Sequence, residues 1–178
     1  CIRDRIKART AAFRDHSIEV GQVLLTPKEL QTTKDARNAL KTINQLHCFR
    51  VLPIVNENDT TATDEIQFGD NDLLAAKLAK IFKADLLIML SAVEGLYESF
   101  DDQTNQTTLI RQVSKVTKDI HAMAGKASKN GKGGMTSKIE AAKIMLSMNS
   151  NMVITKGDAA NPLLRLKKSV KSTWFNKS

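Results

Sequence analysis

The sequence predicts an α/β fold, built from a mainly parallel sheet with helices packed on it. Short apolar runs rich in β-branched residues recur along the chain, and segments with apolar residues at helical spacing lie between them. Strands that alternate with helices favour parallel pairing through right-handed crossovers. The 178 residues, of which 42% are hydrophobic, suffice for the core of one domain.

Five segments have the length and composition of strands: residues 18–26, 51–55, 85–91, 151–155 and 172–175. The second of them is wholly apolar, as expected for a strand that is covered on both faces of a parallel sheet. Residues 98–112 are polar and are predicted to form a surface excursion, with a hairpin that ends at Leu109-Ile110.

Amphipathic patterns predict helices within residues 1–15 and over residues 35–47, 71–82, 116–124 and 135–148, and a short helix at 162–166. In the third of these segments, Leu74, Leu78 and Ile81 recur at i, i+4 and i+7, which places them on one face. Thr26-Pro27 supplies either a helix N-cap followed by a first-turn proline or a turn.

The chain is basic, with 27 lysines and arginines, 19 acidic residues and a net charge of +8. A nucleic-acid partner is disfavoured, because the lysines are spread along the chain and aromatic residues, on which bases stack, make up only 4%. An anionic small ligand such as a nucleotide suits this charge. No apolar run approaches the roughly eighteen residues of a membrane helix, and the two cysteines form neither a disulfide framework nor a metal-binding spacing. We therefore expect a cytoplasmic protein without a membrane partner.

The stretch Pro53–Asp72 is unusually polar for a connection between a buried strand and a helix, since it contains six Asp or Glu and three Asn. A connection this long is typical of a binding loop, although a plain solvated connection is the alternative. Ligands of parallel sheets bind outside the carboxyl ends of the strands. Asn56 and the turn Ser91-Ala92 lie at two such ends, which predicts a ligand site there.

Two interpretations remain for the end of this stretch. Asp70 or Asn71 could cap the following helix. Alternatively, Asp70 and Asp72 together with Asp59 could hold Mg²⁺ or orient lysines that clamp a phosphate. The sequence offers no Ser-His-Asp or Cys-His arrangement for nucleophilic catalysis.

A glycine- and lysine-rich segment, residues 125–134, precedes the helix predicted at 135–148. The free N–H groups and positive dipole of a helix N-terminus favour phosphate, and Lys138, one turn into the helix, is the lysine expected to contact it. The segment matches neither the P-loop nor the G-x-G-x-x-G pattern, and a solvated surface loop would explain its glycines equally well.

Three motifs in combination identify a resemblance. They are P-I-V-N-E-N-D-T-x-A-T-D-E-I-x-F-G-D-N-D-x-L-A-A from Pro53, A-D-L-L-I-x-L-S-x-V-E-G-L-Y from Ala84, and G-x-G-G-M-x-[ST]-K-x-x-A-A from Gly131. In order and spacing, from about Val20 to Ile154, they resemble the glutamate 5-kinases of the amino-acid kinase family. The kinase module of the bifunctional pyrroline-5-carboxylate synthases is similar.

The resemblance implies a three-layer αβα sandwich and the ATP-dependent phosphorylation of the γ-carboxylate of L-glutamate to γ-glutamyl 5-phosphate, the first step of proline biosynthesis, with ATP and Mg²⁺ as cofactors. It implies that Asn56, Asp59 and Asn71 bind glutamate. Asp72 and Lys138 would be catalytic, with Asp72 orienting the lysines that clamp the phosphate. The nucleotide would contact Ser91, Ala92, Lys132, Gly133, Gly134, Met135, Thr136, Ser137 and Lys138. Feedback inhibition by proline and assembly as a dimer or tetramer are also implied.

The chain departs from the pattern of these kinases in several respects. Ser91-Ala92 stand where the family usually has Thr-Asp, and Lys132 stands where it has threonine. The family's opening strand, with its glycine-rich turn and phosphate-binding lysine, has no counterpart, and neither does its RNA-binding-like C-terminal domain. We interpret residues 1–178 as one partial kinase domain that lacks its N-terminal strands. Residues 1–56 would belong to the amino-acid-substrate lobe, and residues 57–178 would form the substrate loop and the nucleotide-binding lobe.

Such a sheet would expose an apolar edge, so we expect the 178-residue chain alone to be inactive or to self-associate. Two other functions stay open. One is a non-catalytic, truncated or regulatory homologue, which the loss of a carboxylate at Ala92 favours. The other is a family member that acts on aspartate, acetylglutamate, carbamate or a nucleotide.

Overall fold

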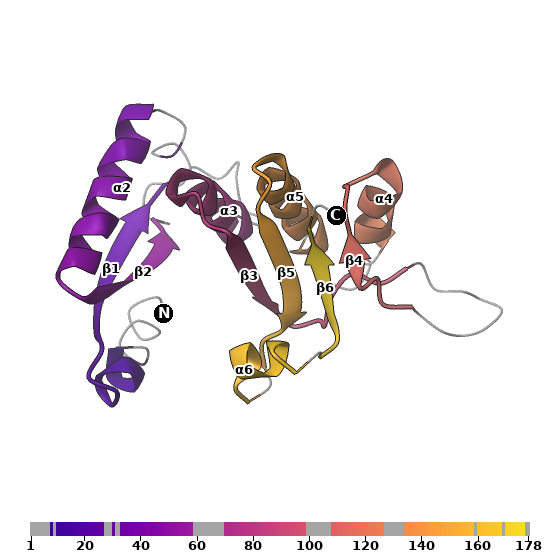
Figure 1. The fold of residues 1–178 in the computed structure, drawn as a ribbon. Helices are drawn as coiled ribbons and strands as arrows, with labels where there is room; N and C mark the ends of the chain where they lie inside the picture. Colours follow the sequence, from indigo (N-terminus) through magenta and orange to yellow (C-terminus); the bar gives the residue numbers. More distant parts are fainter. Residues whose placement is uncertain are drawn as a thin grey trace. The chain divides into compact units, whose positions relative to one another are not determined.

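The computed structural model describes residues 8, 10–26, 30, 33–58, 70–98, 108–126, 134–158, 160–168 and 170–176. It divides the chain into two compact units, Cys1–Ile66 and Gln67–Ser178. Strands and helices occur in both units, which are described separately (Figure 1). Among the helices of the described residues, none has the length and apolar character that crossing a membrane would require.

The first unit is a strand–helix–strand arrangement of β1 (Glu19–Leu25), α2 (Thr33–Cys48) and β2 (Val51–Glu57). The two strands pair in parallel, with Val20 opposite Leu52, and α2 is the crossover between them. Leu25 of β1 and Ala39 and Ile43 of α2 are buried. Their positions follow from the helical spacing of the apolar residues in α2, which turns one side of the helix toward the strands.

The described residues of the second unit form a four-stranded sheet and four helices. In chain order its elements are α3 (Asp70–Phe82), β3 (Leu86–Ser91), β4 (Gln112–Val113), α4 (Lys118–Lys126), α5 (Gly134–Ser147), β5 (Asn151–Lys156), α6 (Pro162–Leu166) and β6 (Ser172–Phe175). The strand order is β3-β5-β6-β4. β3 and β5 are parallel, as are β4 and β6, whereas β5 and β6 are antiparallel.

Helices α3, α5 and α4 lie next to one another behind the strands of this sheet, as Figure 1 shows. They enclose the main core, in which the side chains of Ile139, Met145, Met152, Ile154 and Phe175 are fully buried. Helices α3 and α5 are in contact, and both contribute small residues to this core, namely Ala76 and Ala79 of α3 and Ala141 and Ala142 of α5. Small side chains allow two helices to approach closely, so α3 and α5 are held as a pair.

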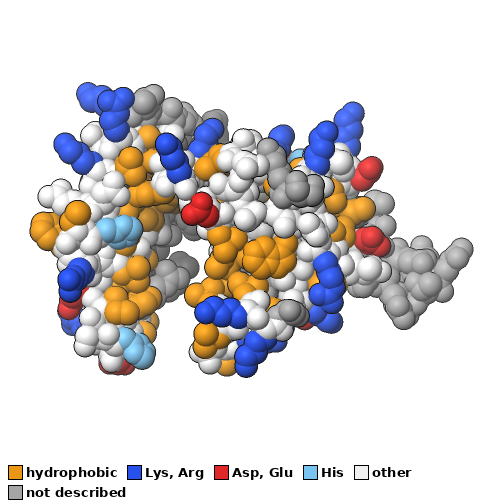
Figure 2. Space-filling view, viewed as in Figure 1, with side chains coloured by type: hydrophobic (Ala, Val, Ile, Leu, Met, Phe, Trp, Pro, Cys, Tyr) orange, Lys and Arg blue, Asp and Glu red, His pale blue; other side chains and the backbone are white. Residues whose placement is uncertain are grey.

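The strand β3 forms one edge of the described sheet, and part of its surface is apolar and accessible. Leu86 and Leu90 are 40% and 49% exposed. Figure 2 shows apolar side chains gathered on the face of this unit that is turned toward the viewer, whereas Lys and Arg are spread over the described surface. An exposed apolar strand edge favours association with another surface.

Helices α3 and α5 both end in a left-handed residue that turns the chain into the next strand. Lys83 has φ 52 and Asn149 has φ 63. After α3, the amide of Ala84 donates to the carbonyl of Ala79 over 2.9 Å, and the amide of Lys83 donates to that of Lys80 over 3.2 Å. This is the Schellman pattern, which satisfies the last carbonyls of a helix. It keeps the connection to β3 short.

The structure confirms the predicted α/β class and the mainly parallel pairing. The predicted hairpin corresponds to a single antiparallel bridge between Tyr97 and Leu109. The sequence did not predict the strand Gln112–Val113, because two residues are too few to show an alternation. The alternative roles of Pro27 lie outside the described residues.

We expect replacement of Lys83 by glycine to stabilise the second unit. The side chain is exposed, and a non-glycine residue in the left-handed region costs roughly 1 kcal/mol. Thermal unfolding of Lys83→Gly should show a midpoint about 1–3 °C higher than that of the wild type.

The matched control is Lys80→Gly, the same substitution in the last turn of α3. Because glycine in a helix costs about 1 kcal/mol relative to a good helix former, this variant should unfold at a lower temperature. A lower midpoint for Lys83→Gly as well would contradict the inferred strain.

Candidate active site

Asp72, Ser137 and Lys138 form a hydrogen-bonded cluster in the second unit. Lys138 Nζ donates to Asp72 Oδ2 over 2.9 Å, and Ser137 Oγ donates to the same oxygen over 2.7 Å. The side chains of Lys138 and Asp72 are only 14% and 22% exposed. Partial burial strengthens their attraction beyond that of an exposed ion pair, which contributes about 0–1 kcal/mol. The cluster therefore fixes an ammonium group at a defined place.

The first turn of α5 also holds this ammonium group. The carbonyl of Gly134 accepts a hydrogen bond from Lys138 Nζ over 3.2 Å. An ammonium group has three N–H donors, so its bonds to Asp72 and Gly134 do not exhaust it. Gly134 is exposed, and among the described residues nothing lies within 4 Å of the position that a Cβ would occupy there. Lys138 thus lies beside an accessible helix N-terminus, where amide N–H groups and the helix dipole favour an anion.

The packing of α3 on α5 explains why residues so distant in sequence meet. Asp72 is the third residue of α3, and Ser137 and Lys138 are the fourth and fifth residues of α5. Both helices lead into strands, α3 into β3 and α5 into β5, through short turns. A helix that packs along the following strand runs against it, so the N-terminus of each helix lies toward the carboxyl ends of the parallel strands. This is the edge where α/β sheets bind ligands.

Ser91 and Ala92 lie at the same edge, at the end of β3. Ser91 is opposite Lys156 of β5, and its carbonyl accepts a hydrogen bond from the amide of Gly157 over 2.8 Å. A Cβ on Gly157 would lie 2.9 Å from the Cβ of Leu90, so only glycine fits there without displacing β3. The end of β3 is therefore held firmly, while Ala92 itself is exposed.

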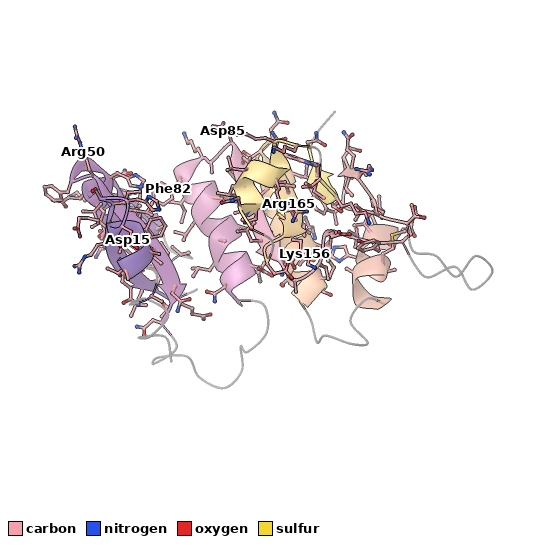
Figure 3. All side chains as sticks on the ribbon, turned by 90° about the horizontal axis from the view of Figure 1, so that it is seen from below. Asp15, Arg50, Phe82, Asp85, Lys156 and Arg165 are labelled. Atoms are coloured by element: carbon pink, nitrogen blue, oxygen red, sulfur yellow. The ribbon has the colours of Figure 1, made fainter. Side chains whose placement is uncertain are left out.

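A cavity of about 360 Å³ opens beside the carboxyl ends of β3 and β5. It is lined by Glu94, Thr155, Lys156, Pro162, Arg165, Val170 and Lys171. Figure 3 labels two of its cationic residues, Lys156 and Arg165, which come from the end of β5 and from α6. Three cations and one carboxylate line this cavity, so its charge favours an anionic ligand.

Glu94 and Tyr97 form a second polar pair at this cavity. Tyr97 donates a hydrogen bond to Glu94 Oε2 over 2.6 Å, and Lys171 Nζ lies 3.6 Å from the same oxygen. The hydrogen bond from Tyr97, aided by Lys171, lowers the pKa of Glu94. Burial, aided by the bond to Glu94, raises the pKa of Tyr97 to about 12. At neutral pH the pair is therefore an anionic carboxylate held by a neutral phenol.

The other residues predicted for the site are divided between the two units, and some of them fall outside the described residues. Asn56 is the next-to-last residue of β2 in the first unit, where it is half-buried and its Nδ2 lies 3.4 Å from the carbonyl of Glu57. In the second unit Asn71 is exposed in the first turn of α3, and in α5 Met135 is half-buried and Thr136 is exposed. Asp59, Lys132 and Gly133 fall outside the described residues, as does the side chain of Asp70.

Sequence reasoning missed the charged lining of the cavity. Lys156 directly ends a predicted strand, and the rule that ligands bind at carboxyl strand ends could have indicated it. Arg165 and Lys171 gave no such signal, because they belong to α6 and to the turn before β6. Glu94 and Tyr97 were part of a quoted motif, but their hydrogen bond was not foreseen.

The model of the family described as "Amino acid kinase family" matches residues 6–156, and the chain belongs to this family. Curated relatives named glutamate 5-kinase confirm the resemblance. The protein from Nitrobacter hamburgensis is 44% identical over 162 residues, which is 90% of this chain and 43% of the relative. The protein from Agrobacterium fabrum is 40% identical over 170 residues, which is 95% of this chain and 44% of the relative. The chain thus spans about 43% of the length of the Nitrobacter relative.

Solved structures share the fold. An isopentenyl phosphate kinase in a substrate complex matches with a TM-score of 0.61 and 19% identity, covering 93% of this chain and 63% of that one. Carbamate kinase from Giardia lamblia bound to AMP-PNP matches with a TM-score of 0.58 and 14% identity. The match covers 97% of this chain and 70% of that one. At these identities the likeness concerns the fold alone, and it confirms the kinase-like αβα architecture predicted from the sequence.

We expect the tyrosine of the folded chain to titrate near pH 12. Tyr97 is the single tyrosine of the sequence, so the ultraviolet absorbance of phenolate formation reports on it alone. Because folding raises its pKa from 10, the neutral phenol stabilises the folded state fully below about pH 10, and this stability is lost as the pH rises toward 12.

The chain unfolded in denaturant is the control, and its tyrosine should titrate near 10. In Glu94→Gln, which removes the negative charge beside the phenol, the midpoint should fall below that of the wild type. An unchanged midpoint near 10 in the folded wild type would rule out the inferred pair.

Proposed function

We propose that the protein acts as a glutamate 5-kinase, which transfers the γ-phosphoryl group of ATP to the γ-carboxylate of L-glutamate. The observation that supports this most is the cluster in which Asp72 holds Lys138 at the N-terminus of α5. The family membership and the names of the relatives support the choice of reaction. In this proposal the protein works in the cytoplasm, and its product enters proline biosynthesis.

The reaction requires positioning and charge, and it requires no covalent intermediate with the protein. A carboxylate oxygen of glutamate attacks the γ-phosphorus, and the bond from that phosphorus to the β–γ bridging oxygen breaks, so that ADP leaves. The Lys138 ammonium would offset the charge on the transferred group, and Asp72 would keep this ammonium aimed. Ser91, Ala92 and residues 132–138 would contact the nucleotide, and the cationic cavity at Lys156 agrees with an anionic ligand at this edge.

Glutamate would bind through Asn56, Asp59 and Asn71, whose polar groups suit the amino and carboxylate groups of an amino acid. Residues 1–56 would then belong to the substrate lobe, and residues 57–178 to the substrate loop and the nucleotide lobe. Proline as an inhibitor and assembly as a dimer or tetramer belong to the same proposal. The exposed leucines of β3 support an association between chains.

Mg²⁺ would accompany ATP in this reaction. Within the described part of the chain, no group of three or more His, Cys, Asp or Glu side chains could hold a metal ion. In kinases Mg²⁺ is usually bound mainly by phosphate oxygens and water, with one or two carboxylates. Asp72 is a carboxylate of the described cluster. When bound, the ion would neutralise charge on the β- and γ-phosphates.

The decisive test is a chimaera in which the 162 matched residues replace the corresponding stretch of the Nitrobacter hamburgensis glutamate 5-kinase. We expect glutamate-dependent ADP formation from Mg-ATP. In this chimaera Lys138→Met should lower kcat by about 10²- to 10³-fold, because a preorganised charge is removed from the transferred group.

The matched control is Lys143→Met on the same helix, whose side chain is 64% exposed and pairs only loosely, at 3.9 Å, with Glu140. Its kcat should stay within about twofold of the unsubstituted chimaera. Equal losses for both lysines, or ADP formation that does not depend on glutamate, would contradict the proposal.

A non-catalytic binding protein is the second candidate, and Ala92 is the observation that favours it. Ala92 is exposed at the end of β3, where the resembled kinases have a carboxylate. If the residue limits turnover, Ala92→Asp should raise kcat of the chimaera about tenfold or more, without a comparable change in the Kd for glutamate. An inactive chimaera that stays inactive after this substitution, yet binds Mg-ATP and glutamate in calorimetry, would support the second candidate over the first.

A further inference from the structure

The turn that follows β3 is fastened to β6 by one buried hydroxyl group. Thr173, the second residue of β6, is fully buried. Its Oγ1 accepts a hydrogen bond from the amide of Leu96 over 2.8 Å and donates one to the carbonyl of Ile110 over 2.6 Å. The amide of Ile110 in turn donates to the carbonyl of Leu96 over 2.9 Å. Three segments that are distant in sequence are thereby joined in one closed set of hydrogen bonds.

The lack of a side chain at Gly95 leaves room for this hydroxyl group. A Cβ at Gly95 would lie 2.3 Å from Thr173 Oγ1 and 3.0 Å from the Thr173 amide nitrogen. Contacts this short to the backbone and to a buried side chain cannot be relieved by a small shift. The absence of a side chain at Gly95 therefore lets the turn approach β6 closely enough for the bond between Leu96 and Thr173.

The fastened part of the turn lies between the two residues of a polar pair, of which Glu94 lines the cavity. Gly95 and Leu96 are buried, while their neighbours Glu94 and Tyr97 form the polar pair described above. Lys171, two residues before Thr173, contributes the cation beside Glu94. Thr173 of β6 thus holds the turn by hydrogen bonds, and Lys171, which directly precedes β6, places a positive charge beside Glu94.

We propose that Thr173 is a positioning residue for nucleotide binding, acting through the turn Ala92–Tyr97 without contacting the nucleotide. This inference rests on the proposed kinase function, in which Ser91 and Ala92 contact ATP. The hydroxyl is the essential group, because a buried Leu96 amide without an acceptor would carry an uncompensated desolvation cost, and the turn would have to move to regain a partner.

The test compares Thr173→Val, which keeps the shape and removes the hydroxyl, with Thr173→Ser, which keeps the hydroxyl. Phe175→Leu is the control, because Phe175 is equally buried on the same strand and loses only packing. The purified 178-residue chain is used for all variants, below their unfolding temperatures. Two quantities are measured: the Kd for Mg-ATP by calorimetry, and the hydrogen-exchange rate of the Leu96 amide.

For Thr173→Val we expect a Kd at least about tenfold higher and a Leu96 amide that exchanges at least about tenfold faster, since an unmade buried hydrogen bond has effects of this size. Thr173→Ser and Phe175→Leu should keep a Kd within about threefold of the wild type, although Phe175→Leu unfolds at a lower temperature.

Equal losses of affinity in Thr173→Val and Phe175→Leu would overturn the positioning role and leave the proposed kinase function standing. An unchanged exchange rate of Leu96 in Thr173→Val would also overturn it. A wild-type chain with normal Leu96 protection that binds no Mg-ATP would overturn the nucleotide role of Thr173, whereas the proposed kinase function is tested separately by the chimaera.

Discussion

The close packing of α3 against α5 is the constraint on which the candidate site depends. Asp72 and Lys138 are 66 residues apart in sequence, and no strand pairing joins them. They meet because alanines of both helices are buried in one cluster, which leaves room for the helices to approach. Bulkier residues there would separate a carboxylate from its ammonium partner without touching either. The distance between Asp72 and Lys138 thus depends on apolar residues that lie one to two helical turns further along α3 and α5.

The sequence predicted the regular elements well where the period of apolar residues was long enough to be read. Helix α5 and strand β5 were predicted within a residue of their observed bounds, since Ile139, Ala142 and Leu146 repeat at helical spacing and β5 is a continuous apolar run. The direction of β6 could not be predicted. A strand of four residues has the same pattern in either direction, and the structure shows that β6 pairs with β5 in antiparallel orientation.

The candidate site was predictable to the extent that it follows a motif or a strand end. Asp72 and Lys138 were singled out because each lies near the start of a predicted helix, the resemblance implied catalytic roles for both, and the structure joins them by a hydrogen bond. The cavity beside Lys156 depends on which strands are neighbours, because Ser91 meets Lys156 only when β5 pairs with β3. Thr173 was not foreseen at all. A threonine within a strand is typical of β-branched residues in sheets. The residues around it in the sequence do not indicate that its hydroxyl group bonds to a distant segment.

The order of strands in the second sheet has a consequence for how the protein is made. β4 precedes α4, α5 and β5 in the sequence, yet its partner in the sheet is β6, and Thr173 of β6 is 77 residues from the amide that it binds. Contacts of such long sequence separation close slowly, because the loop between them must first be ordered. During synthesis, the turn after β3 therefore leaves the ribosome long before its fastening strand exists. The sheet edge formed by the ends of β3 and β5 stays unfinished until β6 has been translated and added.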